Sequence, residues 1–283
     1  MNLTAIDLKG SLIAISTVEA PLPWHTPAET IVFHHGLGAS KGIWNSWTPT
    51  LVERYRLVSF DMRGHGASPL PANYEWSMDN AIDDLNAVLD AATNIADGAI
   101  GNPNGKQKVH LVGESIGGTI ALAFAARHPE RLASLTISNG THKGGSIENL
   151  KPWQDLIASG GMAAWSAYMM QQRFHQGVLP DAMWRWYETQ QSEASQDAIL
   201  PAATMLVGVD LTDQLPNISI PTLLMHPDGS PFIPVPVVAE LHALLPNARL
   251  EIFGNTRHGL PFSHAPRCSR TLRRFLASLT LDE

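Results

Sequence analysis

The sequence contains little cysteine, little charge and no long apolar run. Its single cysteine, Cys268, excludes an internal disulfide and, having no paired spacing, argues against a zinc site. Charged residues make up 16% of the chain, below the usual quarter, which suits a compact and largely buried protein. No stretch approaches the length of a membrane span and the N-terminus lacks a signal-peptide pattern, so we expect a cytoplasmic protein.

The charge balance narrows the class of partner. The 283 residues carry a formal net charge of −7, and no run of lysine or arginine appears. Nucleic acid is therefore an unexpected partner, and no feature indicates a membrane, a metal or a cofactor. We expect the partner to be a small-molecule substrate and the protein to be a monomer or a homodimer.

Apolar segments of strand length alternate with segments of helical spacing along most of the chain. This alternation is typical of an α/β fold, in which a mostly parallel sheet is covered by helices on both faces. The predicted strands are Leu12–Ser16, Thr30–His34, Arg56–Phe60, Val109–Val112, Leu132–Ile137, Pro221–Met225 and Arg249–Phe253.

Residues 142–215 interrupt this alternation. They contain no convincing strand and are rich in tryptophan and methionine. We predict a helical cap over 142–215, inserted into a core formed by residues 1–141 and 216–283. Any single tryptophan, such as Trp153, could simply pack inside the cap, but a thin cap has little interior of its own. As a set, these side chains predict an apolar lining that faces the core, with Trp153 as a candidate for substrate binding.

A G-x-S-x-G pentapeptide lies at the junction between a predicted strand and a predicted helix. It spans Gly113 to Gly117, with Ser115 at its centre. At such a junction the pattern is typical of a nucleophile elbow, a tight bend that lifts a serine hydroxyl above a parallel sheet. The pentapeptide alone is a weak signal, and its position between strand and helix is what makes Ser115 a candidate nucleophile.

An activated serine also needs a base and donors for the oxyanion. The glycine-containing loop after the strand at 30–34 predicts one backbone donor, the N–H of Leu37, and the N–H of Ile116 is the other. In this fold the base follows the last strand, where His258 lies, so we predict His258 as the general base. His264, six residues further on, is expected at or near the start of the last helix, either on the surface or behind the residues that form the site.

Four motifs make the chain resemble the α/β-hydrolase superfamily over essentially its full length. They are His35-Gly36-Leu37-Gly38, Asp61-Met62-Arg63-Gly64-His65-Gly66-Ala67-Ser68, Gly113-Glu114-Ser115-Ile116-Gly117-Gly118 and Arg257-His258-Gly259. The resemblance implies an α/β-hydrolase fold, with a mostly parallel eight-stranded sheet flanked by helices and a helical cap. Asp61 and Arg63 are expected to brace loops. Within the superfamily, stretches at 128–132, 160–165, 172–174 and 210–215 are similar to 3-oxoadipate enol-lactonase-like serine hydrolases.

The acid of the expected catalytic triad departs from the family pattern. Relatives place an aspartate on the loop after the penultimate strand, and counting from Pro221 to Pro234 puts Ser230 at that position. Asp228, two residues earlier, could orient His258 if the loop is reshaped, and we take it as the candidate acid. It could equally cap its own loop in a turn. Asn139, after another strand, offers only a hydrogen bond.

Three functions remain open from the sequence. The first is a serine hydrolase that cleaves a small ester or lactone, with Arg173 of the cap as a candidate clamp for a substrate carboxylate or, alternatively, a solvated helix residue. The second is C–C bond hydrolysis or cofactor-free non-hydrolytic chemistry on the same fold, which the serine at position 230 makes more plausible. The third is a ligand-binding protein with little turnover, which the joint presence of Ser115, His258 and the oxyanion loop argues against.

Overall fold

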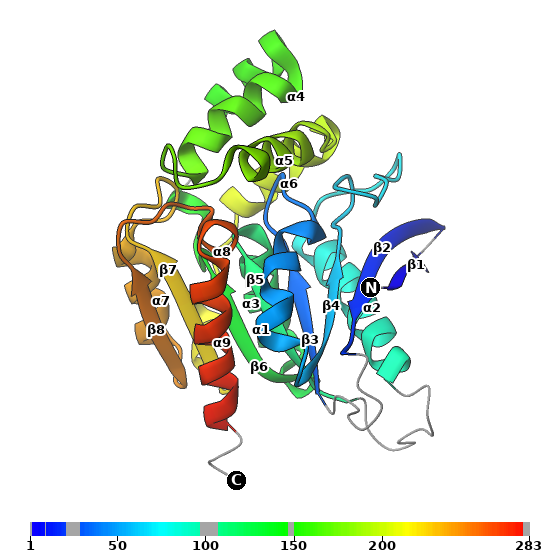
Figure 1. Ribbon diagram of the computed structural model, residues 1–283, viewed down its shortest axis with the longest axis vertical. Helices are drawn as coiled ribbons and strands as arrows, with labels where there is room; N and C mark the ends of the chain where they lie inside the picture. The colour runs from blue at the N-terminus through cyan, green and yellow to red at the C-terminus, as the bar shows by residue number, and fades with distance from the viewer. Residues whose placement is uncertain (1, 9, 21–28, 97–106, 147–149, 280–283) are drawn as a thin grey trace.

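The computed structural model describes residues 2–8, 10–20, 29–96, 107–146 and 150–279. Eight strands form one sheet in the order β1-β2-β4-β3-β5-β6-β7-β8 (Figure 1). The six strands from β4 to β8 run parallel, whereas β1 and β2 pair antiparallel at one edge. The strands are β1 Asn2–Leu8, β2 Ser11–Val18, β3 Glu29–His34, β4 Tyr55–Phe60, β5 Val109–Glu114, β6 Leu132–Ser138, β7 Thr222–Pro227 and β8 Ala248–Phe253. The predicted eight-stranded, mostly parallel sheet is confirmed.

Helices cover both faces of this sheet. Along β3, Ile31 and Phe33 pack into the core beneath α1 and α9, whereas Val32 packs into the core beneath α2 and α3. Successive side chains of a strand point to opposite faces, which is why a continuous apolar run marks a strand buried on both sides. The core helices are α1 Thr48–Leu51, α2 Met78–Ala96, α3 Ile116–Arg127, α7 Val235–Leu244, α8 Leu260–Ser263 and α9 Ala265–Leu279, with 3₁₀ helices at Lys41–Trp47, Pro129–Arg131, Gly144–Ser146 and Thr212–Asn217.

Strand β1 is the element that the sequence pattern does not predict. Its seven residues are exposed or half-buried throughout, and Leu3 is 71% exposed. The strand pairs along its whole length with β2, from Asn2 opposite Thr17 to Leu8 opposite Ser11. Tertiary pairing, and not burial, therefore defines it, and apolar periodicity gives no signal for such an edge strand.

Three long helices lie together beyond the sheet, at the top of Figure 1, between β6 and β7 in the sequence. They are α4 Lys151–Arg173, α5 Asp181–Ser192 and α6 Gln196–Val207. The chain enters and leaves this region side by side, because the Gly144 N–H donates to Val209 O at 2.8 Å and the Leu211 N–H donates to His142 O at 2.9 Å. This arrangement agrees with the predicted helical cap, whose exact boundaries stay a prediction. None of the described helices is both long and apolar enough to cross a membrane.

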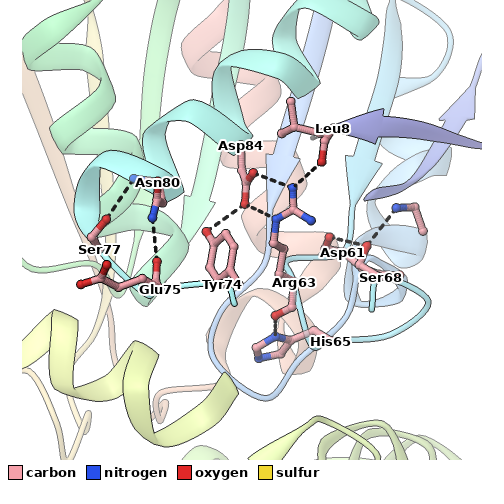
Figure 2. Close-up of polar contacts among 11 residues, drawn as sticks. Leu8, Asp61, Arg63, His65, Ser68, Tyr74, Glu75, Ser77, Asn80 and Asp84 are labelled. Carbon is pink, nitrogen blue, oxygen red and sulfur yellow. Dashed lines mark hydrogen bonds and ion pairs between the residues drawn. The ribbon is translucent and has the colours of Figure 1, made fainter. Parts of the chain in front are cut away.

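The loop after β4 is braced by Arg63, as expected (Figure 2). Its Nε and Nη2 donate to the two carboxylate oxygens of Asp84 on α2, at 2.8 and 3.0 Å, and Nη2 also reaches the Leu8 carbonyl at 3.3 Å. The Tyr74 hydroxyl donates to the same carboxylate at 2.9 Å. A bidentate, buried contact of this kind fixes both partners. The loop that carries His65 is thereby held in place for its contact with the functional site.

Candidate active site

Ser115 sits at a strained bend between β5 and α3. Its φ of 55° and ψ of −123° lie in a region that non-glycine residues rarely occupy. The flanking glycines permit the bend. A Cβ on Gly113 would lie 2.5 Å from Gly117 O, and one on Gly117 would lie 2.5 Å from His35 O. This is the geometry of a nucleophile elbow, and its strain is maintained by buried neighbours.

His258 reaches Ser115 from the loop between β8 and α8. Its Nε2 lies 2.9 Å from Ser115 Oγ, which is hydrogen-bond distance. The Phe232 ring packs edge-on against the imidazole with the ring centroids 4.8 Å apart. The Asn139 side-chain amide donates to the His258 backbone carbonyl. Sequence reasoning found no role for Asn139 beyond a hydrogen bond, and its contact fixes the backbone that carries the base.

The two predicted oxyanion donors lie at the ends of neighbouring strands. Strands β3 and β5 are paired in parallel, so the loop after β3 and the start of α3 meet at one edge of the sheet. Ile116 is the first residue of α3, where a backbone N–H has no partner within its own helix. The loop that carries Leu37 is fixed by the loop after β4, because the Gly38 N–H donates to His65 Nε2 at 3.0 Å. The role of the Leu37 and Ile116 N–H groups as oxyanion donors stays a prediction.

The group beside the second ring nitrogen of His258 is Ser230. Its Oγ lies 3.0 Å from His258 Nδ1. Asp228 is the orienting acid that the sequence predicts, and this prediction is not supported. The Asp228 carboxylate accepts the backbone N–H groups of Asn255 at 2.8 Å and Thr256 at 3.0 Å, and the side chain is exposed. Those two hydrogen bonds use the carboxylate as a brace for the turn before His258 and hold it away from the ring.

Replacing Asp228 with alanine is therefore expected to affect stability more than activity. Loss of two exposed hydrogen bonds should lower the free energy of unfolding by about 1 kcal/mol. Activity of the folded protein should fall by less than about tenfold, against about 10⁴-fold for removal of a triad acid. Denaturant unfolding and kcat measured on the same preparation check this. A 10⁴-fold loss of kcat in a folded Asp228→Asn protein would restore Asp228 as the acid.

A small pocket opens above Ser115 between the sheet and the cap. Trp153 of α4 lines it, as predicted, and packs edge-on against Phe232 with the centroids 6.0 Å apart. Most of the lining is apolar and comes from both layers: Leu37, Trp153, Met169, Ala203, Leu206, Phe232 and Ile233, with Thr119 and Thr141 beside them. Such a pocket fits a small, largely apolar group next to the serine. Within the described ranges, no cluster of three or more His, Cys, Asp or Glu side chains is placed to hold a metal ion.

Arg173 lies at the end of α4 and is buried, so it is not a solvated helix residue. It also lines the pocket. Its Nε donates to Gln191 Oε1 at 2.8 Å and its Nη2 donates to the Leu37 carbonyl. Nη1 lies 3.9 Å from the carboxylate of Glu114 and makes no hydrogen bond to the described part of the protein. Arg173 thus ties the cap to the oxyanion loop, and the N–H groups of its Nη1 have no hydrogen-bond acceptor among the described residues. Sequence reasoning missed Glu114 and Gln191 as its partners.

The family model for the α/β hydrolase fold matches residues 29–198, well over half of the chain. The chain belongs to the α/β-hydrolase family. A curated relative is the pimeloyl-[acyl-carrier protein] methyl ester esterase of Aeromonas hydrophila, 24% identical, with 87% of this chain and 94% of that protein aligned. Another is 3-oxoadipate enol-lactonase 1 of Acinetobacter baylyi, 29% identical, with 74% of this chain and 73% of that protein aligned.

Solved structures share the fold of this α/β hydrolase. The enol-lactonase of Burkholderia xenovorans LB400 superposes with a TM-score of 0.84 at 20% identity, covering 97% of this chain and all of that one. At that identity the likeness concerns the fold. The resemblance to enol-lactonase-like members that the motifs predicted is confirmed at the level of the family.

The electrostatics of the candidate site favour an uncharged imidazole. Burial lowers the pKa of His258 well below its usual 6.5, and the positive charge of Arg173 lowers it further. Within the described residues no ion pair joins the ring to a carboxylate that would raise the pKa again. Burial also raises the pKa of Glu114 to about 7, against the opposing charge of Arg173. Protonation of Glu114 removes the negative charge that offsets the Arg173 guanidinium. The guanidinium charge then favours the neutral form of His258 more strongly.

The pH profile of kcat/KM should therefore show no fall at mildly acidic pH from protonation of His258. A base works when neutral, and lowering its pKa extends the neutral range toward acid. We expect the limb of kcat/KM that belongs to His258 to lie well below pH 6.5. An inflection near pH 7 would belong to Glu114 and should disappear in Glu114→Gln. A limb at or above pH 6.5 that persists in Glu114→Gln would contradict this account.

Proposed function

We propose that this chain is a serine hydrolase that cleaves a small carboxylic ester or lactone through an acyl-enzyme on Ser115. The observation that carries the proposal is the 2.9 Å contact between Ser115 Oγ and His258 Nε2 at a strained elbow under an apolar pocket. A serine is a weak nucleophile unless a base stands within hydrogen-bond reach. A protein that only binds a ligand needs neither the strain nor the base.

The proposed reaction has two halves. Ser115 Oγ attacks the acyl carbon while His258 takes its proton, and the N–H groups of Leu37 and Ile116 stabilise the negative oxygen of the tetrahedral intermediate. His258 then protonates the leaving oxygen, and the C–O bond breaks to leave an ester on Ser115. A water molecule, deprotonated by His258, attacks the acyl carbon, and His258 returns the proton to Ser115 Oγ as the acyl–Oγ bond breaks and the acid is released. Each oxyanion donor typically contributes about 3 kcal/mol to stabilising the transition state.

The pocket limits the substrate to a small acyl group. Its lining is apolar except for Ser115, His258, Arg173 and two threonines, so a short hydrocarbon chain or ring would be desolvated there at little cost. The names of the two curated relatives, a methyl ester esterase and an enol-lactonase, support the same substrate class.

The Nη1 of Arg173, which has no hydrogen-bond acceptor among the described residues, supports a preference for acyl groups that end in a carboxylate. A buried guanidinium nitrogen without a hydrogen-bond acceptor is costly, and the Glu114 carboxylate at 3.9 Å is too far away to accept one, so a substrate carboxylate would satisfy it. We expect kcat/KM to be about tenfold higher for a half-ester of a dicarboxylic acid than for an uncharged ester of equal length. Arg173→Gln should abolish this ratio. The uncharged ester controls for the separate loss of the Leu37 contact, and a ratio unchanged by the substitution would exclude the clamp.

Covalent labelling tests the proposed function directly. A fluorophosphonate probe requires an activated serine and should label the wild-type protein at Ser115 and leave Ser115→Ala unlabelled. Peptide mapping identifies the modified residue. No labelling of folded wild-type protein at Ser115 would favour the ligand-binding alternative.

One observation favours a second candidate function. The partner of His258 Nδ1 is a hydroxyl and not a carboxylate, so an imidazolium formed during acyl transfer gains no charge stabilisation from it. Chemistry that uses His258 and Ser115 chiefly as proton donor and acceptor, such as C–C bond hydrolysis or a cofactor-free conversion, would demand less of this position. Turnover of such a substrate without any acyl-enzyme at Ser115 would select this alternative.

A further inference from the structure

Ser230 occupies the position from which an acid orients the base in related hydrolases. A carboxylate at this position can only accept a hydrogen bond, so it places a proton on Nδ1 and leaves Nε2 free to take a proton. A hydroxyl can either donate or accept, and its surroundings decide which. The other partners of Ser230 therefore determine where the proton of His258 resides.

Those partners are both donors. The backbone N–H groups of Phe232 and Ile233 point at Ser230 Oγ, at 3.4 and 3.2 Å. A hydroxyl oxygen has two lone pairs and one proton. When the two N–H groups occupy the lone pairs, what remains for His258 Nδ1, 3.0 Å away, is the hydroxyl proton.

We propose that the Ser230 hydroxyl donates to His258 Nδ1 and so holds the resting imidazole in its Nε2–H tautomer. In that tautomer Nε2–H donates to Ser115 Oγ across the 2.9 Å contact. The hydrogen bond between nucleophile and base is then present, but Nε2 already carries a proton and cannot accept the one from the Ser115 hydroxyl. Ser230 is in this sense a positioning residue that acts through His258, and the inference rests on the proposed function for its effect on rate.

Catalysis then requires a change of tautomer before attack. The Nε2 proton must leave and Nδ1 must gain one, exchanged through water, with no change in the charge of the ring. The Ser230 hydroxyl must at the same time turn its proton away from Nδ1. Since a wrongly placed tautomer lowers turnover about 10⁴-fold in serine proteases, the resting arrangement should keep the wild-type enzyme slow.

The decisive measurement is the ¹⁵N spectrum of the histidine side chains, in which protonated and unprotonated ring nitrogens have well-separated shifts. His258 is assigned among the 12 histidines by the signal that disappears in His258→Gln. We expect a protonated Nε2 and an unprotonated Nδ1 in the wild-type protein. Ser230→Asp should reverse the two, and Ser230→Ala, which has no hydroxyl to fix either form, should show averaged shifts.

The kinetic consequence is a gain of function. Ser230→Asp should raise kcat for a short ester by about 10²-fold or more, with little change in KM, because the introduced carboxylate would fix the catalytic tautomer and stabilise the imidazolium. A wild-type ring with its proton on Nδ1 overturns the proposal at any level of activity. If folded Ser230→Asp carries a proton on His258 Nδ1 and its kcat is unchanged, the proposed effect of the tautomer on rate is contradicted. Absence of fluorophosphonate labelling at Ser115 would instead count against the proposed function, with the tautomer result still standing.

Discussion

Substituting alanine for Ser115 is expected to lower kcat/KM for short esters by about 10³-fold or more. The substitution removes the only atom within hydrogen-bond reach of His258 Nε2 in the described part of the chain, so no acyl-enzyme can form. Residual hydrolysis would come from the oxyanion donors and the pocket alone. The measurement is the rate of release of p-nitrophenol from p-nitrophenyl esters of short acids.

A matched serine controls for any general effect of the substitution. Ser159 is exposed on the cap helix α4, and its hydroxyl donates only to the Asp155 and Leu156 carbonyls of its own helix, among the described residues. Ser159→Ala should keep wild-type activity within about twofold, as surface substitutions usually do. Ser115→Ala protein that cleaves these esters at a rate close to that of Ser159→Ala would show that Ser115 is not the nucleophile.

Substituting glutamine for His258 is expected to cause the second large loss, again about 10³-fold or more in kcat. Glutamine fills part of the same space beside Phe232 but can neither take the Ser115 proton nor return it to a leaving group. The loss should fall mainly on kcat, because the ring acts on the reacting atoms more than on the bound ground state. Steady-state kinetics of both variants separates kcat from KM.

His264 supplies the matched histidine. It lies at the junction of α8 and α9, half-buried, with its Nδ1 2.9 Å from Ser263 Oγ. Burial lowers the pKa of this histidine too, so a low pKa by itself does not distinguish the two. His264→Gln should keep kcat within a few-fold of wild type, as expected for a residue outside the site. Equal losses in the two glutamine variants would mean that His258 contributes to folding and not to proton transfer.

The parallel core and the nucleophile elbow could be predicted because local sequence determines them. Buried parallel strands need continuous apolar runs, and the elbow needs small residues where the backbone passes within contact distance of itself, as at Gly113 and Gly117. Strand β1 could not be predicted in this way, because its exposed residues carry no apolar pattern. Its place in the sheet depends on β2, which only the tertiary structure brings beside it.

The orienting group shows the limit of reasoning from residue type. Counting along the loop places Ser230 at the position of the acid, yet the preference for a negative charge favours Asp228 as the functional residue. The structure shows that the position in the loop decides, since Ser230 contacts Nδ1 and Asp228 caps the turn at Asn255 and Thr256. To turn toward an imidazole, the Asp228 carboxylate would have to give up its hydrogen bonds to these two backbone N–H groups.

Arg173 is predicted as a clamp on the cap, and the structure adds a contact that no sequence pattern indicates. Its hydrogen bond to the Leu37 carbonyl joins residues 136 positions apart in the chain. The same side chain lowers the pKa of His258 by its charge. The cap thus acts on both the predicted oxyanion loop and the base through one residue, which only the packing of α4 over the sheet could reveal.

Trapping of an acyl-enzyme tests the central claim most directly. Wild-type protein is mixed with an excess of a short activated ester, quenched in acid within the first turnovers, and digested for mass spectrometry. The account predicts that the peptide containing Ser115 gains the mass of the acyl group and that Ser115→Ala gains none. Turnover of the ester by wild-type protein with the Ser115 peptide unmodified at every quench time would contradict the account.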